Sequence, residues 1–301
     1  MLFDVSQADL ILFPLGLGGS YAIPNSVTNI GTSAFYECRG LTSMMLPNSV
    51  ASIGSEAFEF CYGLTNLDLG GGIRNIGTAA FFYCSGLTSV TIPGSDSNIS
   101  SYAFYNCSGL TKLDLGSGVS NIDEQAFFGC VNLPRLTIPN SVTNIGSGAF
   151  ADCIGLANLD LGSGVTYIGT FAFSSCSTLS GIYFQGNSPT PTNDSSVFSG
   201  DPAIVYYLSG ATGWGSLFDG LPAVPWNPQV QKDASFGVQT NQFGFNIAGS
   251  SNLVIVVEAC TNLANPVWQV VSTNVLTGGL SYFGDPQWTN YSGRFYCFVS
   301  P

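Results

Sequence analysis

The sequence predicts a repeat solenoid of parallel β-strands with short helical turns, followed by a small all-β sandwich domain. Two observations support this prediction. A 23-residue period runs through the first two-thirds of the chain, and periods of this length are typical of stacked repeats. After about residue 227 the period ends, and β-rich runs alternate with Gly, Ser, Asn and Pro, which indicates separate strands joined by turns.

We divide the chain into four parts on this basis. Residues 1–19 are expected to form a partial repeat or an inserted hairpin at a truncated start, and residues 20–184 the solenoid. Residues 185–226 are expected to form a capping unit, and residues 227–301 the sandwich. The apolar run near the start lacks the basic region of a signal peptide, because the first Lys or Arg is Arg39. No run approaches the ~20 apolar residues that span a bilayer. We therefore expect no membrane insertion, and an export signal that is absent from this chain.

Five residue types recur at fixed positions of the repeat. Ile, Ala, Phe, Cys and Leu each return at steps of 23 residues over seven repeats. A single unit cannot bury its apolar side alone, so stacking on identical neighbours is expected to create one continuous core. The cysteine column consists of Cys38, Cys61, Cys84, Cys107, Cys130, Cys153 and Cys176.

Each repeat is predicted to hold two short strands and one turn of helix. In one unit, residues 64–69 predict a strand with three leucines turned inward, and residues 73–76 predict a second extended piece. Residues 79–84 predict a helical turn that places Phe81 and Cys84 in the interior. Successive units are expected to pair their strands in parallel.

Residues 185–226 predict an atypical last unit, because a stack must cover its open end. Trp214, Phe218 and Trp226 supply apolar cover, and residues 213–218 predict a short helix before two prolines.

The remaining residues favour a small antiparallel β-sandwich. Cys260 and Cys297 lie in two of its β-rich runs, and the sequence leaves open whether they pair. The runs are residues 242–248, 252–259, 267–273, 280–283 and 294–299.

The composition excludes several classes of function. The chain has no histidine, which removes His-dependent nucleophiles and His-ligated metal sites. Its 18 acidic and 6 basic residues give a net charge of −12, which opposes binding to nucleic acid because such binding needs clustered Lys and Arg. No C-x₂-C pair or calcium loop is present. We expect no cofactor, no metal and no catalytic residues, and hence not an enzyme.

The cysteine column permits three readings. Equivalent Cα atoms in stacked strands lie ~5 Å apart, which is within the range for disulfides. However, in-register side chains point the same way, and seven is an odd number. The column also lacks the ligand spacing that is usual in metal clusters. The favoured hypothesis is that these residues are buried, reduced thiols that act as small core side chains.

The outward positions of the predicted strands form the candidate binding face. Aspartate alternates with threonine along it, and the main alternative is that these aspartates are solvated and keep an exposed sheet soluble. Aspartates on alternate strands lie ~9.6 Å apart, just beyond the carboxylate spacing of inverting glycosidases, which argues against catalysis. The face consists of Asn66, Asp68, Thr91, Lys112, Asp114, Arg135, Thr137, Asn158, Asp160 and Tyr183.

A stripe of aromatic residues follows the Ala-Phe positions on the opposite side. These rings are expected to pack along the turns, with an interaction patch as the alternative if they are exposed. They are Tyr36, Phe60, Phe82, Tyr83, Tyr105 and Phe128.

The repeats resemble the BspA-like leucine-rich repeat of bacterial surface proteins. The pattern Leu-Thr-x-x-x-Ile-Pro-Asn-Ser-Val-x-x-Ile-Gly-x-x-Ala-Phe-x-x-Cys is clearest at residues 133–153 and extends over residues 20–184, more loosely over 185–226. This resemblance implies a leucine-rich-repeat solenoid, usually exported, used for adhesion or protein–protein interaction, with no catalytic residues. Asp96, in place of Val or Ile, is expected to loosen one turn. The last 75 residues are similar to modules that end many secreted environmental bacterial proteins.

Three hypotheses for function follow. The first is a non-catalytic extracellular or cell-surface interaction or adhesion protein that presents its repeat sheet to a protein or glycan. The second is a carbohydrate-binding or carbohydrate-active secreted protein, with Trp268, Tyr282 or Trp288 of the last domain on the polysaccharide. The third is a structural segment of a larger surface stalk or filament.

Overall fold

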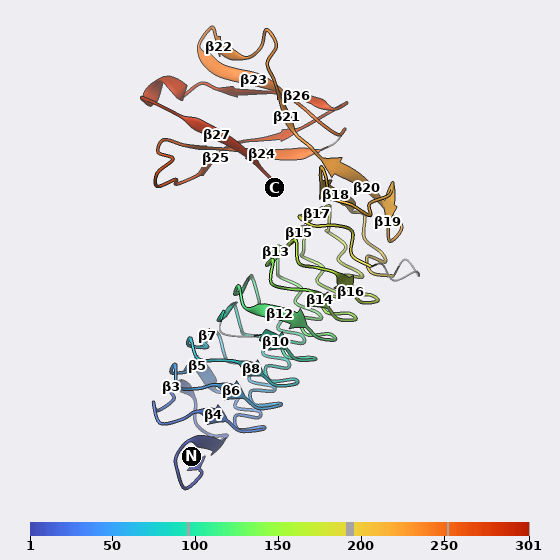
Figure 1. Cartoon of the computed structure of the whole chain (residues 1–301). Helices are drawn as coiled ribbons and strands as arrows, with labels where there is room; N and C mark the ends of the chain where they lie inside the picture. Colours follow the sequence, from blue (N-terminus) through green and yellow to red (C-terminus); the bar gives the residue numbers. More distant parts are fainter. Residues whose placement is uncertain (95–96, 191–195, 252, 301) are drawn as a thin grey trace. The chain divides into compact units, whose positions relative to one another are not determined.

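The computed structural model describes residues 1–94, 97–190, 196–251 and 253–300, and it divides into two compact units (Figure 1). The solenoid unit comprises Met1–Val205 and Ala211–Ala223, and the C-terminal unit comprises Tyr206–Gly210 and Val224–Pro301. Asp96 and its expected loosened turn lie outside the described residues.

One side of the solenoid is built from parallel strands that carry the leucine column. Their register follows the period, because Leu136 lies beside Leu159 and Leu159 beside Ile182. Among the residues that the structure describes, this leucine-strand side contains three sheets. They are β3 (Gly19–Ala22), β5 (Leu41–Met45) and β7 (Asn66–Asp68); β9 (Ser89–Ile92) and β11 (Lys112–Leu115); and β13 (Arg135–Ile138), β15 (Asn158–Leu161) and β17 (Gly181–Phe184), which continues into the last unit.

A second side carries the isoleucine column in one nine-stranded sheet. Each strand is short, and Ile53 lies beside Ile30 and Ile76 in register. The pairing of β10 with β12 shifts register between Ser97 and Asn98. In spatial order the strands are β1 (Leu2–Phe3), β2 (Asp9–Leu12), β4 (Asn29–Ile30), β6 (Ser52–Ile53), β8 (Asn75–Ile76), β10 (Ser97–Ile99), β12 (Val119–Ile122), β14 (Asn144–Ile145) and β16 (Tyr167–Ile168).

The hairpin near the start extends the core of the first repeat. β1 pairs antiparallel with β2, and Leu10 of β2 lies beside Ile30. The Phe13 ring stacks on Phe35 with centroids 4.8 Å apart. Both Leu10 and Phe13 are buried, so the hairpin supplies the same apolar contacts that a further repeat would supply.

The third side shows that the expected helical turn is wrong. Residues 79–84 form successive turns in which Ala79 (φ 55°) and Tyr83 (φ 57°) have left-handed backbone. Alternate donors bond within the segment, where Phe82 N–H donates to Ala79 O and Cys84 N–H to Phe81 O at 3.1 Å. The donors between them bond to the next unit, because Phe81 N–H donates to Ala103 O at 2.7 Å and Tyr83 N–H donates to Tyr105 O at 2.8 Å. Each non-glycine residue in this conformation costs about 1 kcal/mol, which the ladder between units offsets. We call this side the turn side.

The interior is filled by the stacked phenylalanine column. Phe104 is fully buried, and its ring lies parallel to Phe81 and Phe127 at centroid distances of 5.0 and 5.1 Å. The stack continues through every repeat and ends at Phe198. The predicted continuous core is therefore confirmed.

The last unit caps the stack with strands rather than with the expected helix. β17 is followed in the sheet by β18 (Ile204–Leu208), β20 (Leu221–Trp226) and β19 (Leu217–Phe218). β19 and β20 form a two-residue hairpin, because Asp219 and Gly220 both have positive φ, the geometry that Asp-Gly favours. Trp214 and Phe218 contact the Phe184 ring as the predicted aromatic cover.

The C-terminal unit contains two antiparallel sheets (Figure 1). They contact each other through aromatic rings, with Phe283 5.4 Å from Tyr296 and Phe245 6.1 Å from Phe298. One sheet contains β21 (Gln229–Gln231), β22 (Gly237–Gln239), β23 (Gln242–Ala248) and β26 (Leu280–Asp285), and the other contains β24 (Val254–Cys260), β25 (Gln269–Val275) and β27 (Phe295–Val299), with one turn of 3₁₀ helix at η1 (Trp288–Asn290).

Candidate functional site

The residues of the candidate binding face occupy outward positions on the leucine-strand side. Parallel pairing places Thr91 beside Asp114 and Arg135 beside Asn158, as the period predicts. Asn158 is half-buried, whereas Asp160 and Tyr183 are buried. The exposed members are Asn66, Asp68, Thr91, Lys112, Asp114, Arg135 and Thr137.

Asp160 corrects the expectation that the aspartates of this face are solvated. Its side chain is only 8% exposed, and its Oδ2 accepts a 2.7 Å hydrogen bond from Arg135 Nη2. On the next strand, a Cβ at Gly181 would lie 2.8 Å from the Tyr183 ring, so this ring lies back over Gly181. The face therefore has an open polar part and, around Asp160, a covered ion pair.

A groove of about 780 Å³ opens at the other end of the face. Met45, which is 58% exposed, and Asp68 contribute to its lining. Turns of neighbouring units complete it, where Gly70 N–H donates to Asp68 Oδ1 at 3.0 Å and Gly71 N–H donates to Asn48 Oδ1 at 2.6 Å. Sequence reasoning named Asp68 but missed the groove, because the groove depends on how adjacent turns stack.

The cysteine column is buried throughout. From Cys61 to Cys176, each Sγ donates to the carbonyl oxygen of the phenylalanine in the preceding unit, at 3.1 to 3.6 Å. Burial raises the pKa of the Cys38 thiol to about 11 and that of Cys61 to about 12. These side chains therefore act as protonated core groups, and among the residues that the structure describes no three His, Cys, Asp or Glu converge on a metal position.

Asp201 is a buried titratable residue that sequence reasoning missed. It takes the place of cysteine in the last unit, because its N–H donates to Phe198 O at 3.1 Å as Cys61 N–H does to Phe58 O. The Asp201 side chain is 9% exposed, and neither carboxylate oxygen has a hydrogen-bond partner within the described ranges. The step from Cys176 is 25 residues instead of 23, which hid the equivalence.

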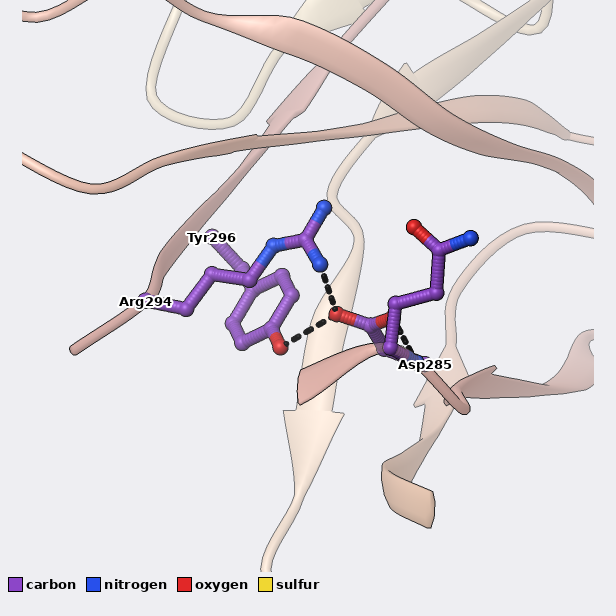
Figure 2. A network of polar contacts seen from close by, with 4 residues as sticks. Asp285, Arg294 and Tyr296 are labelled. Carbon is purple, nitrogen blue, oxygen red and sulfur yellow. Dashed lines mark hydrogen bonds and ion pairs between the residues drawn. The ribbon is translucent and has the colours of Figure 1, made fainter. Parts of the chain in front are cut away.

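The C-terminal unit carries a buried polar network rather than a pair of cysteines (Figure 2). Asp285 is 1% exposed and forms a 2.8 Å ion pair with Arg294. Its Oδ2 also accepts a 2.8 Å hydrogen bond from the Tyr296 hydroxyl. Strand pairing places Cys297 opposite Glu258 rather than Cys260, which answers the question that the sequence left open.

The three aromatic residues considered for polysaccharide binding are not brought together. Trp268 and Trp288 are half-buried and Tyr282 is 40% exposed. They lie before β25, in η1 and on β26 respectively. In the described part of this unit no ring contact joins any two of them.

Parallel leucine strands, a parallel isoleucine sheet and a stacked phenylalanine core together define a leucine-rich-repeat solenoid. The family described as BspA type leucine rich repeat region matches residues 19–120 and 97–205 in six copies. The chain belongs to this family, which confirms the resemblance of its repeats. No curated protein matches the sequence.

Similar solved structures come from bacterial leucine-rich repeat proteins. A leucine rich cell surface protein from Faecalibacterium prausnitzii is 26% identical over 69% of this chain and 60% of its own, with a TM-score of 0.44. The leucine rich repeat protein of T. pallidum is 25% identical over 73% of this chain and 86% of its own, with a TM-score of 0.42. The chain thus spans less than two-thirds of the first of these proteins. Within the described residues, no helix has the length and apolar character needed to cross a membrane.

Proposed function

We propose that this chain is a non-catalytic, exported interaction protein that binds a protein or glycan partner through its leucine-strand face. The observation behind the proposal is the in-register row of exposed polar side chains, with Thr91 beside Asp114 and Ser89 beside Lys112. Membership of the BspA type leucine rich repeat family supports a location at the cell surface. The face offers both hydrogen-bond donors and acceptors on a rigid scaffold, which suits recognition.

Steric substitution on this face tests the proposal. Thr91→Arg places a long side chain in the middle of the row, and Ser120→Arg makes the same change at an exposed position of β12 on the other sheet. We expect Thr91→Arg to weaken binding at least tenfold on arrays of purified extracellular proteins and polysaccharides, and Ser120→Arg to leave it within twofold. Equal binding by both variants would assign the partner to another surface.

The polysaccharide alternative for the C-terminal unit receives no specific support, because Trp268, Tyr282 and Trp288 are dispersed. The same arrays distinguish the two sites. If Tyr282→Ala in the full chain abolishes glycan binding and Thr91→Arg does not change it, the C-terminal unit rather than the sheet face binds the glycan.

A further inference from the structure

A surface on the turn side is distinct from the leucine-strand face and combines carboxylates with aromatic rings, of which Tyr36 and Tyr62 are exposed and the others half-buried. Phe60 lies 5.9 Å from Tyr36, 5.9 Å from Tyr62 and 5.8 Å from Tyr83, measured between ring centroids. The rings thus form one connected surface over the first four repeats. We call it the aromatic patch, and its members are Tyr36, Phe60, Tyr62, Phe82, Tyr83 and Tyr105.

These rings are retained where the backbone disfavours them. Phe60 (φ 61°) and Tyr83 (φ 57°) occupy a left-handed position in the turn, and the corresponding residue two units later is Gly129 (φ 69°). Bulky side chains are strained in this conformation, whereas glycine is not. Both rings are half-buried, so part of each is accessible at the surface of the turn side.

The charge around the patch is negative. Burial, and then the charges of Glu59, Glu37 and Glu56, raise the pKa of the Tyr36 hydroxyl, so three carboxylates lie near enough to act on it. Glu59 also has its pKa raised by burial and by the neighbouring Glu56. Among the described residues, only Glu37 of these three forms an ion pair, with Arg39 at 3.3 Å.

Arg39 shows which chemical group this surface accommodates. Its guanidinium lies 5.5 Å from the centroid of the Tyr62 ring while it pairs with Glu37. A guanidinium therefore already sits between a ring and a carboxylate of the patch. Glu56 and Glu59, whose charges also act on the Tyr36 hydroxyl, form no ion pair among the described residues, although Glu56 Oε2 accepts a 3.2 Å hydrogen bond from the Ser33 hydroxyl. They offer the same combination of ring and carboxylate to a cation from outside.

We propose that the aromatic patch docks an arginine-rich, extended segment of a partner protein. Arginine fits better than lysine because its planar guanidinium stacks on aromatic faces and also pairs with carboxylates. Alternate side chains of an extended segment are ~6.6 Å apart, more than the ring-to-ring steps of 4.8 to 5.9 Å along the patch, and the long arginine side chains can take up this difference. The negative charge of the surface complements the segment, and the exposed Tyr36 and Tyr62 rings, with the accessible parts of the half-buried rings, provide its apolar contact area.

The experiment uses the full chain and a labelled 12-residue peptide of alternating Arg and Ser, followed by fluorescence anisotropy at moderate salt. Peptides with Lys or Glu in place of Arg serve as comparisons. We expect the Arg peptide to bind at least threefold more tightly than the Lys peptide, and the Glu peptide not to bind. Absence of Arg-peptide binding, or equal binding of the Arg and Lys peptides, overturns the proposal.

Matched variants locate the binding. The double change Glu56→Gln and Glu59→Gln removes two charges from the patch, and Asp68→Asn with Asp114→Asn removes two from the leucine-strand face. We expect at least a fivefold loss of affinity for the first pair and less than twofold for the second. Equal losses would mean general attraction to an acidic protein. The control pair also separates this proposal from the sheet-face function.

A further pair of variants tests the role of the ring. Tyr62→Ser should lower the affinity for the Arg peptide at least threefold. Arg39→Gln should tighten it, because it frees the Tyr62 ring and Glu37, whereas Arg74→Gln, at an exposed position outside the patch, should not. As a control for folding, each variant should have the same midpoint of thermal unfolding as the unmodified chain. If neither Tyr62→Ser nor Arg39→Gln changes the affinity for the Arg peptide, the peptide does not bind at the aromatic patch.

Discussion

The solenoid unit and the C-terminal unit bury polar groups in different ways. In the solenoid, each unit from the second to the seventh places one thiol against a carbonyl oxygen of the unit before it, at 3.1 to 3.6 Å. In the C-terminal unit, the single carboxylate of Asp285 forms an ion pair with Arg294 and accepts hydrogen bonds from the Tyr296 hydroxyl and the Gln287 N–H (Figure 2). The solenoid thus spreads many weak polar contacts, and the C-terminal unit concentrates charge at one residue.

This difference predicts how each unit responds to damage. Contacts in a stack are made between neighbours, so the loss of one side chain weakens two interfaces and its effect stays local. Asp285 lies at the end of β26 and its partners Arg294 and Tyr296 lie at the start of β27 or just before it, so one carboxylate connects the two sheets. Its loss should affect the C-terminal unit as a whole.

The largest effect is expected for Phe104→Ala in the centre of the solenoid. Removing a buried Phe typically costs 3–5 kcal/mol, and loss of two stacked ring contacts adds to this cost. We expect about 5 kcal/mol, with hydrogen-exchange protection lost in the third to fifth repeats and retained in the C-terminal unit. Loss of protection across all described residues of both units would contradict independent units.

Phe35→Ala serves as the comparison at the start of the array. Because Phe35 stacks on both Phe13 and Phe58, its replacement should cost nearly as much as that of Phe104. A cost of less than half would indicate that the first hairpin frays.

Asp285→Asn is expected to have the next largest effect. The substitution keeps the size of the side chain but leaves the Arg294 guanidinium, whose side chain is 11% exposed, without its counter-charge. Breaking a buried ion pair in this way costs about 3 kcal/mol. Urea unfolding followed by tryptophan fluorescence should report this loss, because three of the four tryptophans belong to the C-terminal unit, while hydrogen exchange in the repeats stays unchanged. Arg294→Lys alone, which keeps a positive charge beside Asp285, should cost less than Asp285→Asn.

Much of the solenoid could be predicted because the period repeats the same information in every unit. The column of Phe81 and Phe104 was correctly placed in the core, since one register satisfies every unit at once. The turn around Tyr83 was wrongly predicted as a helix, because the acceptor of its N–H lies in the next unit and local propensity does not include that acceptor. The Asp-Gly hairpin at residues 219–220 was a local signal that went unused.

The candidate face shows the same limit. Strand parity placed Asp160 outward, and this is correct for the backbone, but burial depends on Arg135 and Tyr183 from neighbouring strands. Asp201 escaped notice because two extra residues interrupt the period before it. Side chains whose environment comes from another unit are therefore the ones that periodicity alone describes least well.

Asp201 yields the third prediction, a pH dependence located at the cap of the solenoid. Burial raises the pKa of its carboxyl group to about 7, and the facing Cys176 N–H offsets part of this rise although its geometry falls short of a hydrogen bond. Cys176 is the other titratable group beside it, with a pKa raised mainly by its own burial and further by Cys153 and Asp201. At neutral pH that thiol stays protonated, so the carboxyl group is the one that titrates.

The sign of the effect follows from linkage. The folded state holds this proton more tightly than the unfolded chain does, so the stability of the solenoid falls as pH rises from the unfolded pKa near 3.8 to the folded value of about 7. Between pH 5 and 8 the loss is about 2–3 kcal/mol, at 1.36 kcal/mol per unit of pKa shift. Asp201→Asn removes the titration, and Asp201→Cys restores the cysteine column at the cap. Both variants should exceed the unmodified chain in stability at pH 8 and approach it at pH 5, as measured by urea unfolding followed by circular dichroism. The prediction fails if the free energies of unfolding of Asp201→Asn and the unmodified chain differ by the same amount at pH 5 and pH 8. That result would mean that the carboxyl group is solvated when the cap is folded.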